Sequence, residues 1–165
     1  MQDSSWLATV RGASLERPMQ VRVIVAGKPA LAYAKAGVDE YLKRLSRFGS
    51  FELLTVKAGG KDEVSGRLLE RSEGSYRIAL DERGGTFTTR KFAQRLEALE
   101  NRGDVKAVSF LIGAADGHND QLRAACDLLI AVSPFTLQHE LALVILLEQL
   151  YRVASLKAGM PYHRD

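Results

Sequence analysis

The spacing of hydrophobic positions changes several times along the chain, and each change marks a predicted element. Residues Gln20–Ala26 (QVRVIVA) alternate and are rich in β-branched side chains, which predicts a strand. Over residues 30–48, apolar side chains recur at intervals of three and four, which is typical of an amphipathic helix. Residues 51–58 (FELLTVKA) predict a second strand, and a polar, glycine-rich link over residues 59–66 follows it.

The same alternation continues through the rest of the chain. Residues 76–81 (YRIALD) predict a third strand, and Thr89–Asn101 predicts a helix with one apolar side. Residues 107–113 (AVSFLIG) are almost entirely apolar, which predicts a buried fourth strand. Residues 127–132 predict a fifth strand, and residues 139–158 predict the last helix. Strands that alternate with helices indicate an α/β fold with a mostly parallel sheet and flanking helices.

Three loops follow strand ends, where parallel sheets hold their ligands: LDERGG, GAADGHN and SPFTLQH. Small residues such as Gly113 and Gly117 let a backbone approach a ligand closely, although a plain strand-to-helix turn explains them as well. Leu80 belongs either to the core or to the wall of an apolar pocket. We expect His118 to be exposed and without a chemical role, and His139 to support the start of the last helix.

The last predicted helix is apolar on almost every side over LALVILL. Such a helix is buried on more than one face, and in a small domain a symmetric dimer interface is a natural place for the second face. Glu148 and Arg152 stand four positions apart, so they share a helix face and predict at least an ion pair. Gly159 and Pro161 then end the helix just before the chemically rich tail YHRD.

Composition adds modest limits to this picture. A chain of 165 residues with 46% hydrophobic content fits one globular domain, which we expect over residues 19–165, with residues 1–18 as an extension outside the core. The net charge of +3 permits an acidic partner such as RNA without selecting one. A lone Cys126 without a zinc-binding pattern suits the reducing cytoplasm and predicts no metal site. The longest apolar run falls well short of the roughly 20 residues that cross a membrane.

The stretch FLIGAADG, followed by SPFTLQHELALVILLEQLYRVASLKAGMPYHRD, resembles the RlmH/YbeA family of the SPOUT methyltransferases. The resemblance covers residues 19–165 and is most specific in EQLYR and PYHR. It implies a C-terminal trefoil knot and methylation of N3 of a pseudouridine in large-subunit (23S) ribosomal RNA, with S-adenosyl-L-methionine as the cofactor. It also implies a homodimer that binds ribosomal RNA, in which the cofactor pocket of one subunit meets the tail of the other.

The resemblance assigns two groups of residues. The implied cofactor contacts are Leu80, Gly113, Val132, Ser133, Pro134, Phe135, Thr136 and Leu137. The implied catalytic group, acting across the dimer, is His163, Arg164, Tyr162, Glu148 and Arg152. His163 is a candidate for the base that takes the N3 proton, because histidine ordinarily has a pKa near neutrality. Alternatively, His163 contacts the RNA and water takes the proton. The two arginines could hold phosphate or uracil oxygens through paired donors, and Tyr162 could stack on a base.

Three positions depart from the family's usual pattern: Ala114 replaces a glycine, Gln138 a proline and Leu143 an arginine. The last change removes a positive charge near the expected RNA surface. The departures at Leu143 and Gln138 motivate an alternative, a non-catalytic ribosome- or RNA-binding module that keeps the fold. A nucleotide-binding oxidoreductase also fits the α/β pattern, but the chain lacks the glycine fingerprint of that class.

Overall fold

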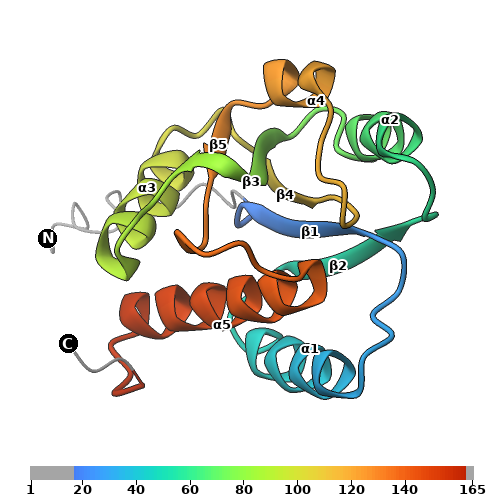
Figure 1. Ribbon diagram of the computed structural model, residues 1–165. Helices are drawn as coiled ribbons and strands as arrows, with labels where there is room; N and C mark the ends of the chain where they lie inside the picture. The colour runs from blue at the N-terminus through green and yellow to red at the C-terminus, as the bar shows by residue number, and fades with distance from the viewer. Residues whose placement is uncertain (1–16, 163–165) are drawn as a thin grey trace, which may run out of the picture.

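The computed structural model describes residues 17–162, which form a five-stranded parallel sheet between two layers of helices (Figure 1). The strands are β1 (Gln20–Ala26), β2 (Phe51–Val56), β3 (Tyr76–Gly85), β4 (Ala107–Ile112) and β5 (Leu128–Ile130). The helices are α1 (Ala32–Leu45), α2 (Lys61–Arg71), α3 (Thr89–Asn101), α4 (Asp120–Ala125) and α5 (His139–Lys157). The strand order is β2-β1-β4-β3-β5, and every pairing is parallel.

The two faces of the sheet carry separate hydrophobic cores. Helices α1, α3 and α5 cover one face, where Val23 and Phe110 meet Leu146 of α5. Helices α2 and α4 cover the other face, where Leu68 and Leu122 pack on the sheet. Strand β4 lies between β1 and β3 and all of its residues are buried, as its continuous apolar sequence predicts. The predicted α/β class with a parallel sheet is therefore confirmed.

All five predicted strands and three predicted helices are present, but the sequence reasoning missed two short helices. Helix α2 begins inside the predicted glycine-rich link over residues 59–66 and continues to Arg71, with Val64 and Leu68 on its buried face. Helix α4 has only 6 residues and contributes one buried side chain, Leu122. Helices this short and polar gain most of their stability from tertiary packing, so their own sequence pattern is weak.

Helix α5 is covered largely by its own chain. It packs against the sheet and lies between α1 and α3, which bury much of its additional apolar surface. A side-chain carbon at Gly37 of α1 would come within 2.9 Å of Val144, so the absence of a side chain there lets the two helices approach closely. The near-continuous apolar character of α5 is thus explained within one subunit, and the homodimer stays a prediction.

Some predictions concern features that the described residues do not test. The predicted extension over residues 1–18 lies almost entirely outside residues 17–162, and the implied knot stays a prediction. Within that described part of the chain, no helix is both long and apolar enough to cross a membrane. Nor do its histidines, cysteines and carboxylates form a group of three that could hold a metal ion.

Candidate functional site

A cleft of about 400 Å³ opens where the loops after β3, β4 and β5 meet. Seven of the implied cofactor contacts line it, namely Leu80, Gly113, Val132, Ser133, Phe135, Thr136 and Leu137. Pro134 lies in the same loop but is not part of the lining. The implied cofactor residues are therefore neighbours in space, although up to 57 positions separate them along the chain.

The first wall of the cleft is a bulge in β3. Leu80 and Gly85 both pair with Ile130 of β5, so residues 81–84 leave the strand between two points of attachment. A side-chain carbon at Gly84 would lie 2.5 Å from the backbone of Ile130, a distance that no ordinary contact allows. Only glycine fits at position 84, because the backbones of β3 and β5 touch there.

The second wall is the tight turn after β4. Gly117 has a φ of +78°, a conformation that favours glycine, and its N–H donates to the carbonyl oxygen of Ala114 at 2.9 Å. A side-chain carbon at Gly113 would lie 3.1 Å from both the Gly117 oxygen and His118 Nδ1. The missing side chain at Gly113 therefore leaves a small recess in the wall of the cleft, which we call the Gly113 cradle. Even a methyl group at position 113 would fill this recess.

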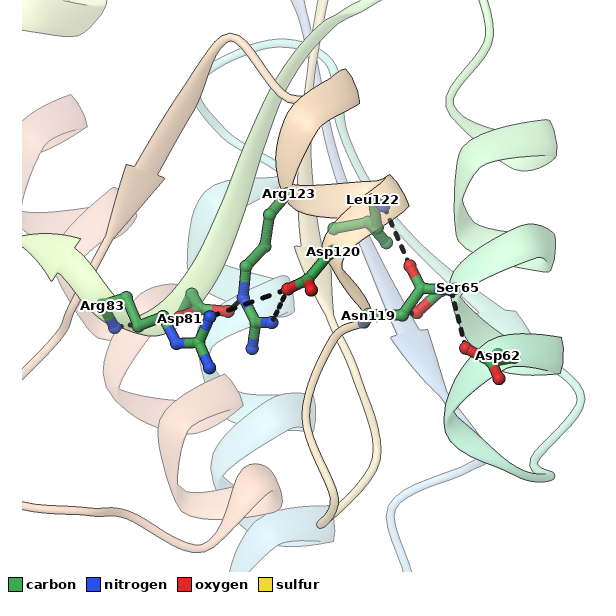
Figure 2. Close-up of polar contacts among 8 residues, drawn as sticks. All are labelled: Asp62, Ser65, Asp81, Arg83, Asn119, Asp120, Leu122 and Arg123. Carbon is green, nitrogen blue, oxygen red and sulfur yellow. Dashed lines mark hydrogen bonds and ion pairs between the residues drawn. The ribbon is translucent and has the colours of Figure 1, made fainter.

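A buried ion pair ties the β3 bulge to α4 (Figure 2). Arg123 Nε donates to Asp81 Oδ2 at 2.7 Å, and the backbone N–H of Arg83 donates to Asp81 Oδ1 at 2.9 Å. Burial by itself raises the pKa of Asp81, but these hydrogen bonds and the charge of Arg123 outweigh it and hold the pKa below its ordinary value. Arg123 also pairs with the exposed Asp120 at 3.1 Å. The carboxylate thus holds two loops of the cleft in register.

Helix α4 is fixed at its other end by Asn119 (Figure 2). The Asn119 side chain accepts from the N–H of Leu122 at 2.9 Å, which caps the helix, and donates to Asp62 of α2 at 2.9 Å. The backbone N–H of Asn119 donates to Ser65 Oγ at 3.1 Å. Sequence reasoning missed both this anchor and the Asp81–Arg123 pair, since their partners come from elements that it did not predict.

The expectation that His118 is exposed is wrong. Its relative exposure is 2%, and it lies in the floor of the cleft directly after the Gly117 turn. Burial lowers the pKa of His118, which keeps the ring neutral. Neither ring nitrogen has a hydrogen-bond partner among residues 17–162. Gly117, with its positive φ, turns the following side chain inward, and the sequence carries no separate signal for this.

The start of α5 closes the third side of the cleft. Gln138, rather than His139, caps the helix, because its side-chain oxygen accepts from the N–H of Leu141 at 3.0 Å. His139 lines the cleft beside it. The next residue, Glu140, is buried and accepts from the N–H groups of Ala30 and Leu31 at the start of α1. The first turn of α5 therefore organises both the cleft and its neighbouring helix.

The described part of the implied catalytic group forms a second cluster near the end of α5. Arg152 Nε donates to Glu148 Oε1 at 3.0 Å, and the Tyr162 hydroxyl donates to the same oxygen at 3.3 Å. The Arg152 guanidinium lies over the Tyr162 ring, 4.9 Å from its centroid. His163 and Arg164 lie outside the described residues. Glu148, Arg152 and Tyr162 are thus brought together as a unit.

Aromatic rings hold Tyr162 against the helix. Its ring meets that of Tyr151 edge to face with 4.5 Å between centroids, and Arg44 of α1 lies 6.0 Å from the Tyr162 centroid. Burial is the main cause of a raised pKa of Tyr162, and the hydrogen bond with Tyr41 raises this pKa further. The phenol is therefore a neutral donor at physiological pH, suited to binding and stacking rather than to taking a proton.

The cleft and this tail cluster are separate within one subunit. Ala142 is the last residue of α5 that lines the cleft, and Arg152 comes ten residues later on the same helix, about 15 Å away at the rise of an α-helix. Neither Glu148 nor Arg152 belongs to the lining of the cleft. The implied cofactor contacts and the implied catalytic group are thus two separate groups in one subunit.

Residues 19–163 match the protein family described as "Predicted SPOUT methyltransferase". The chain belongs to this SPOUT methyltransferase family. Ribosomal RNA large subunit methyltransferase H of Thermus thermophilus is 47% identical over 146 residues, covering 88% of this chain and 99% of that protein. The protein of the same name from Deinococcus radiodurans is 40% identical with the same coverage. The solved tRNA (m1G37) methyltransferase from Aquifex aeolicus shares the fold, with a TM-score of 0.52 and 14% identity over 88% of this chain and 75% of that one.

The departures from the usual SPOUT pattern have structural explanations. Ala114 keeps a negative φ, as do all described non-glycine residues, so the methyl group is tolerated. Gln138 supplies the helix cap. Leu143 is fully buried in the core beneath α5, so position 143 does not belong to an exposed RNA surface as expected. These three residues therefore give no specific support to a non-catalytic binding module.

Proposed function

We propose that this chain is an S-adenosyl-L-methionine-dependent methyltransferase that methylates N3 of a pseudouridine in 23S ribosomal RNA. The single observation that carries the proposal is the cleft built by the loops after β3, β4 and β5, which gathers the implied cofactor residues. The name shared by the Thermus and Deinococcus relatives supports ribosomal RNA as the substrate. The choice of nucleotide and atom rests on the resemblance in EQLYR and PYHR.

The residues of the cleft fit this cofactor. Leu80 and Ile130 offer apolar walls for an adenine ring, and the cradle at Gly113 admits close backbone contact. The hydroxyl of Ser133 and the backbone of residues 131–137 offer hydrogen-bonding groups along one side. When bound, the cofactor supplies a methyl group on a positively charged sulfur. The protein contributes by holding that methyl group in line with the nucleophile.

The tail cluster is suited to holding the RNA base. Arg152, fixed by Glu148, presents guanidinium donors to uracil or phosphate oxygens, and charge on these oxygens grows as the N3 proton leaves. Tyr162 offers an aromatic face beside it. His163 follows immediately in sequence, and we propose it as the acceptor of the N3 proton, with contact to RNA as its other possible role.

A homodimer is part of the proposal because Arg152 lies about 15 Å along α5 from Ala142, the last residue of that helix that lines the cleft. Phe135, on the rim of the cleft, is 83% exposed, an unusual state for a large apolar side chain. The same ring would be covered if a second subunit or an RNA base closed over the cleft. In this arrangement each active site uses the cleft of one subunit and the tail of its partner.

The decisive experiment is transfer of a radiolabelled methyl group to ribosomes from cells that lack this protein. We expect label in 23S RNA at one pseudouridine, located by mass spectrometry of nuclease fragments, and no transfer by an Arg152→Ala variant. RNA binding without transfer of label would instead identify a non-catalytic binding module. Label at a nucleotide other than pseudouridine would refute the substrate assignment while keeping the methyltransferase activity.

A further inference from the structure

His118 is a buried residue to which neither the resemblance nor the proposed chemistry gives a role. It follows the Gly117 turn and precedes the Asn119 cap of α4, so the backbone on both sides is fixed. Its relative exposure is 2%, yet it contributes to the lining of the cleft. Both ring nitrogens are buried, and in the described part of the chain neither has a hydrogen-bond partner.

The surroundings of the ring explain why it has no partner. The carbonyl groups of Leu80 and Leu111 and the carboxylate of Asp81 lie near enough to favour a proton on the ring, but burial outweighs them, and the pKa of His118 is lowered. Asp81 already accepts from Arg83 and Arg123, and neither carbonyl reaches the ring with good hydrogen-bond geometry. The positive charge of Arg123 also opposes protonation. The imidazole therefore stays neutral, with one donor and one acceptor unused.

Burial of the unpartnered His118 ring lowers the stability of the protein when no ligand is bound. A buried polar group without a partner keeps its full desolvation penalty, and native structures contain few such groups. An apolar side chain of similar size would avoid the penalty. A ligand that bonds to the ring would remove it too, and His118 Nδ1 lies beside the Gly113 cradle, 3.1 Å from the place a side chain would occupy.

We propose that His118 is a binding residue for the nucleoside part of the cofactor, reached through the Gly113 cradle. The inference rests on the proposed function, which supplies the cofactor. A neutral ring with one donor and one acceptor matches an uncharged group of the same kind, such as a ribose hydroxyl or the edge of adenine. The amino-acid part, with its carboxylate and ammonium groups, calls for charged partners or water instead. Adjacent residues Ala115 and Asp116 are exposed, which leaves the loop room to adjust around the contact.

The test compares wild-type protein with His118→Leu in two measurements without RNA. Isothermal titration calorimetry gives the affinity for S-adenosylhomocysteine, and thermal unfolding without ligand gives the stability. We expect affinity to fall about 5- to 30-fold, the effect of losing one hydrogen bond. We expect the melting temperature to rise by about 2–4 °C, because the unpartnered group is gone. These opposite signs separate a binding role from a merely structural one.

Two controls identify the part of the ligand that is bound. His118→Gln keeps a donor and an acceptor, so it should recover part of the affinity. Methylthioadenosine has the nucleoside without the amino acid, so His118→Leu should weaken its binding by a similar factor. Unchanged affinity for S-adenosylhomocysteine, a lower melting temperature, or a loss confined to S-adenosylhomocysteine would each overturn the assignment. If wild-type protein binds no S-adenosylhomocysteine at all, the proposed cofactor fails first, and this inference fails with it.

Discussion

The Tyr162 hydroxyl donates to Glu148 Oε1 at 3.3 Å, which joins the end of the described chain to a point 14 residues earlier on α5. The return is built by Gly159, whose φ of +69° reverses the chain, and by the N–H of Met160, which donates to the carbonyl oxygen of Ser155 at 2.9 Å. The end of the helix thus directs Tyr162 back onto the helix surface. Tyr162 is consequently held in a fixed position beside Glu148 and Arg152.

The shared carboxylate leads to a prediction about Glu148. Glu148→Ala removes the group that holds both Arg152 and Tyr162, so we expect methyl transfer to fall by about 10- to 100-fold, as for lost positioning of a donor. Affinity for S-adenosylhomocysteine should change less than threefold, because Glu148 does not line the cleft of its own subunit. Titration calorimetry and single-turnover transfer measure the two effects. Glu63→Ala, which removes the exposed i,i+4 partner of Arg67 on α2, is the matched control and should leave both unchanged.

Sharing of active sites between subunits can be tested by mixing two inactive variants. Gly113→Val fills the cradle of the cleft, and Arg152→Ala disables the tail cluster. In a mixed dimer, one site combines an intact cleft with an intact tail, whereas the other has neither. We expect each variant alone to be inactive and the mixture, after subunit exchange, to recover about a quarter of wild-type turnover if subunits pair at random. Recovery near zero would show that each subunit works with its own tail.

The contact between β3 and β5 predicts a strong effect of a single methyl group at Gly84. Gly84→Ala places a carbon 2.5 Å from the backbone of Ile130, so we expect a loss of about 2–4 kcal/mol in the free energy of unfolding. Chemical denaturation followed by circular dichroism measures it. Gly66→Ala is the control, since nothing lies within 4 Å of its new methyl group and it belongs to α2. That change should stabilise by about 0.5–1 kcal/mol. Equal effects at both positions would contradict the close approach of the strands.

The buried pair between Asp81 and Arg123 predicts a pH-dependent contribution to stability. The pKa of Asp81 is lower in the folded protein than its ordinary value of 3.8, so its contribution is fully present above that value. It is lost as the pH falls through the lower folded pKa. We expect Asp81→Asn to cost about 1–3 kcal/mol of unfolding free energy at pH 7 and progressively less below about pH 4.

The exposed pair between Asp104 and Arg102 supplies the comparison for this prediction. Both side chains are more than half exposed, so Asp104→Asn should change stability little at any pH. Urea titrations at several pH values measure all three proteins. A difference between Asp81→Asn and wild type that stays constant from pH 7 to pH 3 would show that the charge of Asp81 is not what stabilises the loop.

Much of the layered fold could be read from the chain because hydrophobic periodicity follows the surface that each element buries. The almost entirely apolar 107–113 segment predicts β4 as a buried strand, and the alternating Gln20–Ala26 segment predicts β1, whereas the order of the strands in the sheet came only from the structure. Helices α2 and α4 were missed because their few apolar residues are too sparse to show a period, and only the sheet beneath them makes them stable.

The candidate site also has some features that the local sequence predicts and others that only the tertiary structure shows. Three loops at strand ends, and a helix with Glu148 and Arg152 on one face, follow from local sequence, because strand direction and helical spacing are local properties. Only the tertiary structure shows Asp81 locked to Arg123, Leu143 in the core and His118 buried beneath Gly113. Each of these depends on atoms that come from distant segments, and no spacing along the chain records which distant backbone will cover a side chain.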